Sequence, residues 1–116
     1  FDASFIKRIY TIQNTSITFI RAWQGHQTEQ RWFSAVMGSF RIRLIEIDNF
    51  ENPSHDLKPR TFIVTAETLD VLHIPSGYVS SIQSLEPNSK LIVMSDYLLG
   101  EIQDEYRFEL NYFKCN

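Results

Sequence analysis

The chain has 116 residues, a formal net charge of −3 and 43% hydrophobic residues, with nine Phe, five Tyr and two Trp. This length suits one domain, and the apolar content is too high for a disordered chain. The lack of a basic surplus argues against a nucleic-acid-binding protein, and no apolar run approaches the roughly 18 residues of a membrane span. We therefore expect one domain over residues 1–116, without nucleic acid or membrane as a partner.

Cysteine usage bears on the compartment. The single cysteine, Cys115, has no partner for an internal disulfide, which fits a reducing environment. No signal peptide is evident. We therefore expect a cytoplasmic location.

Alternation with a period of two dominates the sequence, which is typical of β-strands. The clearest case is Phe40–Leu44, which places apolar residues on one face and Arg41 and Arg43 on the other. An apolar segment around Phe5, Ile6 and Ile9 begins the series. The expected strands, in chain order, cover residues 5–9, 16–19, 40–44, 61–65, 71–74, 79–85 and 90–95.

Turn-forming residues separate these strands, as in 37–39, 75–77 and 86–89. The proline-containing stretch 48–60 predicts a surface loop. The acidic tail 96–106 could hold one short helix, and its Asp104-Glu105 pair is expected to be solvated. Many short strands at regular spacing predict an all-β sandwich or barrel.

Two spacings resemble the motifs of metal-binding cupins. Gln24-Gly25-His26 is followed by four residues, then Arg31, then six residues and Gly38. The cupin motif at this spacing has His-x-His, Glu and Gly. The later segment 75–80, Pro-Ser-Gly-Tyr-Val-Ser, is similar to the second cupin motif, Pro-x-Gly-x-x-His. The resemblance implies a double-stranded β-helix, also called a jelly roll.

The residues at the metal-ligand positions of these motifs differ from those of cupins. Gln24 replaces a His, Arg31 replaces the Glu, and Ser80 replaces the last His, so that His26 alone is retained. One imidazole does not hold a divalent ion tightly, and a guanidinium repels it. We expect no metal and no other cofactor.

The segment Phe19–His26 also resembles the sugar-nucleotide cupins. One branch is the dTDP-4-dehydrorhamnose 3,5-epimerases, with an Arg-Gly-Leu-His motif. The other is the WxcM-like dTDP-4-keto-6-deoxyhexose 3,4-ketoisomerases, with Arg-Gly-x-His-x-His. The second matches better, because Arg21 is in place and His26 stands at the second histidine. Residues 38–40, 72–78 and 95–97 extend the similarity.

This resemblance implies an RmlC-like jelly roll and an isomerase or epimerase acting on a dTDP-linked 4-keto-6-deoxyhexose. Such a reaction, in cell-surface polysaccharide biosynthesis, moves a proton through an enediolate. His26 is the candidate base, because imidazole titrates near neutrality, and Gln24 is its candidate partner in catalysis. The candidate substrate-binding residues are Arg21, Arg31, Trp23, Tyr78 and Ser80. Guanidinium groups suit a diphosphate.

Two other functions stay open. The resemblance implies that the first histidine of the family motif is the base in both branches, whereas the amide of Gln24 cannot accept a proton at neutral pH. The chain could therefore be a binding domain for a sugar or sugar nucleotide without catalysis. The missing ligands argue against a metal-dependent cupin oxygenase or phosphomannose isomerase.

Because an apolar edge strand is a liability in a monomer, the segment around Ile9 predicts a homodimer.

Overall fold

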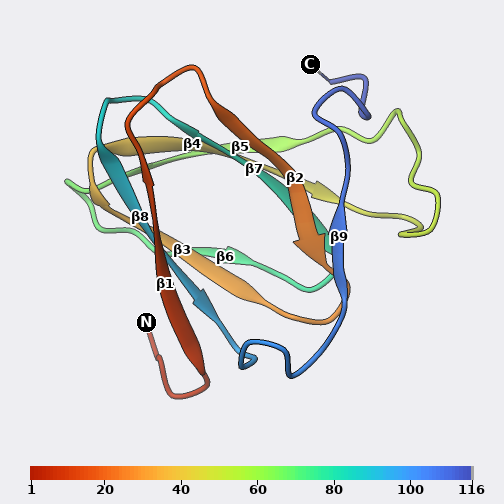
Figure 1. Ribbon diagram of the computed structural model, residues 1–116, viewed down its shortest axis with the longest axis horizontal. Coiled ribbons are helices and arrows are strands. Elements are labelled where there is room, and N and C mark those ends of the chain that lie inside the picture. The colour runs from red at the N-terminus through yellow and green to blue at the C-terminus, as the bar shows by residue number, and fades with distance from the viewer. Residues whose placement is uncertain (116) are drawn as a thin grey trace.

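Residues 1–115 of the computed structural model form two antiparallel β-sheets that pack face to face (Figure 1). One sheet has the order β1-β8-β3-β6 and the other β5-β4-β7-β2-β9. The strands are β1 (Arg8–Asn14), β2 (Ile20–His26), β3 (Arg31–Met37), β4 (Ser39–Glu46), β5 (Arg60–Thr65), β6 (Leu72–Ile74), β7 (Tyr78–Ser84), β8 (Ser89–Ser95) and β9 (Glu105–Arg107). The all-β prediction is confirmed. Within residues 1–115, no helix is long and apolar enough to cross a membrane.

The main core lies between the two sheets because each strand turns its alternate apolar residues inward. Along β4, Phe40, Ile42 and Leu44 are buried, whereas Arg41 on the opposite face is exposed. Both sheets contribute to this core, with Ile12, Phe33, Ala35, Leu91 and Val93 from the first and Phe40, Ile42, Leu44, Val64 and Ile82 from the second. Burial of these side chains is the main term that stabilises the fold.

A second apolar cluster covers the other face of the five-stranded sheet. Trp23 is fully buried there with Ile45 and Val79. Its indole N–H donates to the backbone carbonyl of Leu110 at 3.2 Å, and its ring packs edge-on against Phe113 with centroids 5.6 Å apart. The C-terminal segment thus closes this face of the sheet.

The expected strands after residue 40 coincide with β4 to β8. The strand expected at 16–19 is wrong, because these residues form a bend. In it the hydroxyl groups of Ser16 and Thr18 hydrogen-bond to each other, and the backbone N–H of Thr18 donates to Oγ of Ser16. The tail contains β9 in place of the short helix. The first strand begins at Arg8 and pairs with β8 of the same chain, and Phe5 packs on Trp32 with centroids 4.9 Å apart. The homodimer stays a prediction.

Gly25 allows β2 to lie between β7 and β9, where it pairs with Val79 and Tyr106. A Cβ atom at this position would lie 2.0 Å from the backbone carbonyl oxygen of Tyr78 and 2.6 Å from the Cα of Val79. Because both contacts are backbone atoms, no side-chain rotation relieves the clash. The close approach of the two strands therefore requires glycine.

Replacing Gly25 tests this constraint. We expect Gly25→Ala to lower the free energy of unfolding by about 3 kcal/mol, the upper end of the usual range for overpacked sites. Gly100→Ala is the control, since a Cβ there meets nothing within 4 Å and the left-handed backbone costs only about 1 kcal/mol. Urea unfolding of both variants measures the difference. Equal losses would contradict the clash at Gly25.

Candidate functional site

His26 stands at the end of β2 and lines a cavity between the two sheets. Further strands contribute to the wall of this cavity, among them β1 with Tyr10 and Ile12, β3 with Arg31 and Phe33, and β7 with Tyr78 and Ser80. The cavity therefore collects polar side chains from both sheets at one end of the apolar core. This is the arrangement of a ligand site, in which a few polar groups converge within an apolar surround.

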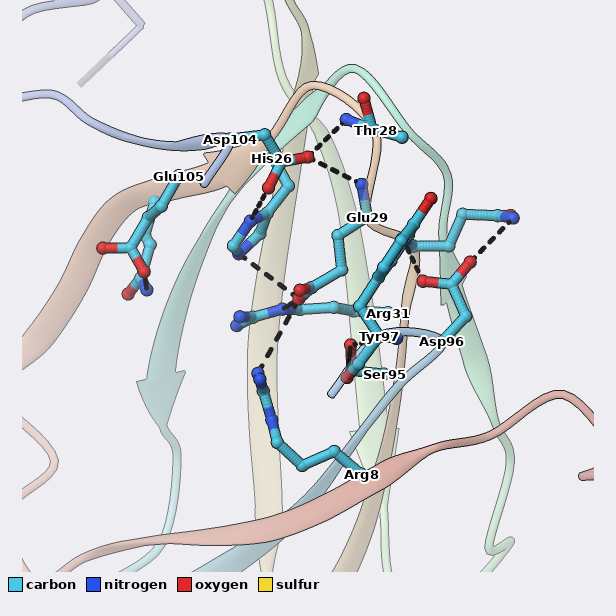
Figure 2. A network of polar contacts seen from close by, with 12 residues as sticks. Arg8, His26, Thr28, Glu29, Arg31, Ser95, Asp96, Tyr97, Asp104 and Glu105 are labelled. Atoms are coloured by element: carbon cyan, nitrogen blue, oxygen red, sulfur yellow. Dashed lines mark hydrogen bonds and ion pairs between the residues drawn. The ribbon is translucent and has the colours of Figure 1, made fainter. Parts of the chain in front are cut away.

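Pairing of β9 with β2 brings a carboxylate to His26. In the register, His26 lies opposite Glu105 and Gly25 opposite Tyr106. Asp104, which directly precedes β9, then lies beside the imidazole, with Oδ1 at 2.9 Å from Nδ1 (Figure 2). Both residues are buried, at 7% and 9% exposure. The sequence-based prediction of a solvated Asp104 is wrong, because a partner 78 residues away covers it.

Asp104 is itself held by the turn that follows β2. Its Oδ2 accepts hydrogen bonds from the backbone N–H groups of Thr28 at 2.6 Å and Glu29 at 2.8 Å. Burial alone would raise the pKa of Asp104, but the hydrogen bonds from Glu29, His26 and Thr28 outweigh it and lower the pKa below its usual value. Asp104 is therefore an ionised, fixed acceptor for the imidazole.

The carboxylate at Nδ1 decides how the ring is oriented. With the proton of Nδ1 donated to Asp104, the other nitrogen, Nε2, is directed to the cavity side. This nitrogen is buried and has no hydrogen-bond partner among residues 1–115. A buried polar atom without a partner is costly. Nε2 is thus the atom of His26 that is available to a ligand.

Glu29 lies on the far side of the ring from Asp104, with Oε2 at 3.5 Å from Nε2 (Figure 2). The same oxygen accepts a hydrogen bond from Nε of Arg31 at 2.7 Å and lies 3.8 Å from a guanidinium nitrogen of Arg8. Arg31 also donates to the hydroxyl of Tyr10 at 2.8 Å. Within the described residues, Arg31 is therefore engaged by protein groups on two sides.

The structure places most of the predicted site residues at this cavity. Arg21, Gln24, His26, Arg31, Tyr78 and Ser80 all line it. Trp23 does not line this cavity, because its side chain is buried in the second apolar cluster, but it borders a neighbouring groove together with Arg21 and Arg107. The side-chain amide of Gln24 donates to Glu105 at 3.0 Å, and the hydroxyl of Ser80 donates to the backbone carbonyl of Gln24 at 3.4 Å.

Sequence reasoning missed Tyr10, Glu29 and Arg107, which line the cavity, and Asp104, which contacts the imidazole of His26. Asp104 and Arg107 come from the tail, and no spacing in the sequence connects that tail to β2. Glu29 had a weak signal, because an acidic residue stands three positions after His26 and two before Arg31. That position corresponds to no ligand of the resembled motif, so the pattern gave it no role.

Comparison with known proteins bears on the fold. No protein-family model and no curated protein matches the chain. Among solved structures, a mutant of the 3,4-ketoisomerase QdtA from Thermoanaerobacterium thermosaccharolyticum in complex with TDP-4-keto-6-deoxyglucose matches at TM-score 0.72 and 19% identity, over 94% of this chain and 71% of that one. A 3,4-ketoisomerase from Helicobacter canadensis matches at 0.72 and 21% identity, over 94% and 74%.

A dTDP-4-dehydrorhamnose 3,5-epimerase from Bacillus anthracis with TDP and PPi bound matches at TM-score 0.73 and 13% identity, over 91% of this chain and 61% of that one. This chain has the RmlC-like cupin fold. Both enzyme families that the sequence resembles are represented among these structures. At such identities the match establishes the cupin architecture, while activity has to be argued from the site.

Many cupins hold a metal, and three side chains of this cupin carry atoms that can ligate a divalent ion. His26, Glu29 and Asp104 offer ligand atoms within 4.8 Å of one another. Asp104 is, however, committed to the imidazole and two amides, and Glu29 forms ion pairs with Arg31 and Arg8. Two guanidinium groups next to the donor set disfavour a cation. These residues do not fit a tightly bound divalent metal.

The Asp104–His26 pair predicts how stability depends on pH. Folding lowers the pKa of Asp104. The contribution of Asp104 to the free energy of unfolding is therefore complete above the pKa of the unfolded state and is lost as pH falls through the pKa of the folded state. Asp104→Asn should cost about 2 kcal/mol at pH 7, since an amide replaces charge-assisted hydrogen bonds. The difference between wild type and variant should shrink below about pH 4. Urea unfolding at pH 7 and pH 3 measures it, and a constant difference would contradict the assignment.

Proposed function

We propose that this cupin is an isomerase of dTDP-linked 4-keto-6-deoxyhexoses that works through an enediolate. The observation that carries the proposal is the buried His26–Asp104 pair, which leaves Nε2, without a hydrogen-bond partner among residues 1–115, for a ligand in the cavity. The similarity in fold to ketoisomerases and epimerases of such sugars agrees with it. The wider proposal is a cytoplasmic homodimer that serves cell-surface polysaccharide synthesis.

The chemistry begins at the carbon next to the ketone. Nε2 of His26 takes the proton from this carbon, and the bonding electrons move to the carbonyl oxygen to form the enolate. Asp104 stabilises the positive charge that the imidazole then carries, as the carboxylate does in other His-Asp pairs. Because both groups are buried and fixed, this stabilisation needs no rearrangement.

Cationic side chains at the cavity suit both the enolate and the diphosphate of the substrate. Arg21, Arg31 and Arg107 line it. Arg31 is held by Glu29 and Tyr10 beside His26, which favours a role at the sugar. Arg21 and Arg107 also line a groove that adjoins the cavity, and the exposed Phe19 lines this groove as well. This groove is where we expect the diphosphate, because guanidinium pairs with phosphate oxygens in two-point contacts.

A second candidate function is binding of a sugar nucleotide without turnover. Gln24 favours it, because the position of a family histidine carries an amide that is itself hydrogen-bonded to Glu105. This candidate shares the cavity and the groove with the first. The two differ only in whether a carbon-bound proton of the sugar exchanges with solvent.

Proton exchange separates the two functions. We expect dTDP-4-keto-6-deoxyglucose, incubated with the protein in deuterated water, to gain deuterium next to the ketone, as measured by mass spectrometry and NMR. His26→Asn should lower the rate about 100- to 10,000-fold, the usual contribution of a general base. His73→Asn is the matched control, since His73 stacks on Trp32 away from the cavity.

The outcomes are distinct when melting temperature is recorded with the same ligand. Stabilisation by the sugar nucleotide without exchange would replace the isomerase with the binding function. If the sugar nucleotide causes neither stabilisation nor exchange, both functions are rejected. Full exchange in His26→Asn would remove His26 as the base.

A further inference from the structure

Glu29 is a buried carboxylate that faces the same nitrogen of His26 as the proposed substrate. We infer that Glu29 is a second catalytic group, which moves a proton between the two neighbouring oxygens of the sugar while His26 moves a proton between the two carbons. This inference rests on the proposed isomerase function. It assigns the site to ketoisomerisation in preference to epimerisation.

The surroundings of Glu29 fix its carboxylate at the cavity wall. The residue is 5% exposed and lines the cavity. Its backbone N–H donates a hydrogen bond to Asp104. Its Oε2 accepts a hydrogen bond from Nε of Arg31 at 2.7 Å and lies 3.8 Å from a guanidinium nitrogen of Arg8. The contacts with His26, Arg31 and Arg8 all use Oε2, and Oε1 makes none of them. The group is therefore preorganised by charge and hydrogen bonding, as a catalytic carboxylate needs to be.

The distance between the two groups decides which atoms they can serve. Oε2 of Glu29 and Nε2 of His26 are 3.5 Å apart, so both reach a bound sugar from the same side. Two groups at this separation can each be within hydrogen-bond distance of adjacent substrate atoms. Inversion at a carbon requires a proton donor on the opposite face of the ring. A pair on one side instead suits transfer between neighbouring atoms, which is ketoisomerisation.

The proton balance of the reaction needs such a second group. His26 removes the proton of carbon 3, and the electrons pass through the new carbon–carbon double bond to the oxygen on carbon 4. Glu29 then accepts the proton of the hydroxyl on carbon 3 and donates it to the oxygen on carbon 4. After its proton exchanges with solvent, His26 finally gives a proton to carbon 4, while the electrons on the other oxygen form the ketone at carbon 3. No oxidant, reductant or metal is consumed.

Without the carboxylate, the first step would still run. The enolate formed by His26 could only be reprotonated at carbon 3, because the hydroxyl on carbon 3 would keep its proton. The substrate would then exchange its carbon-bound hydrogen with solvent without becoming the 3-ketone. Exchange without isomerisation is therefore the signature of the role assigned to Glu29.

The test uses dTDP-4-keto-6-deoxyglucose labelled with deuterium at carbon 3. For Glu29→Gln we expect washout of the label at a rate within about threefold of wild type. Formation of the 3-keto product should be at least about 100-fold slower than in wild type, because this is the smallest usual effect of losing a proton-transfer group. Glu67→Gln, at an exposed glutamate in a turn outside the cavity, is the control for carboxylate loss. Circular dichroism and ligand-induced melting shifts check that the variants fold and bind.

Each outcome decides the matter. Product formation at the wild-type rate in Glu29→Gln would overturn the inference, and so would parallel loss of washout and product in a folded variant that binds ligand. In the latter case Glu29 would act through His26 alone. If Glu29→Gln does not fold, the ratio of washout to product in Glu29→Asp decides, with an increased ratio in favour and an unchanged ratio against. Absence of both activities in wild type would instead reject the proposed isomerase function itself.

Discussion

Strand β2 is hydrogen-bonded on both sides, to β7 and to β9, and the candidate site depends on this double pairing. Glycine at position 25 lets the neighbouring backbone approach closely enough for it. The pairing with β9 then brings Asp104 to the imidazole of His26. A β2 strand without β9 would present a histidine with no partner to set its orientation.

Two buried carboxylates beside one imidazole would be costly if they were left uncompensated. Asp104 is compensated by two backbone amides and the ring itself. Glu29 is compensated by the guanidinium groups of Arg31 and Arg8. Each negative charge is thus matched locally, which holds the ring of His26 between two fixed groups. Arg21 and Arg107 also line the cavity, and Arg107 forms an ion pair with Glu105.

The departures from the cupin metal motif form a coherent set when they are considered together. A guanidinium stands at position 31, where the motif has a carboxylate, and a carboxylate stands two residues earlier at position 29. The two side chains form an ion pair. An arginine engaged in a salt bridge therefore stands where the resembled motif has a metal ligand. The proposed proton transfer and the proposed binding of an anionic ligand both rest on this arrangement.

The sequence by itself determined the all-β class, most strands after residue 40 and the position of His26. It could do so because strand periodicity and turn residues are local properties. The RmlC-like resemblance likewise came from short motifs around residues 19–26 and 72–78. Tertiary structure alone decided the partners of His26, because Asp104 lies 78 residues away in an acidic tail with no motif. It also decided that Trp23 packs into the second apolar cluster, since a shift in the β2–β7 register between Arg21 and Gln24 cannot be read from alternation.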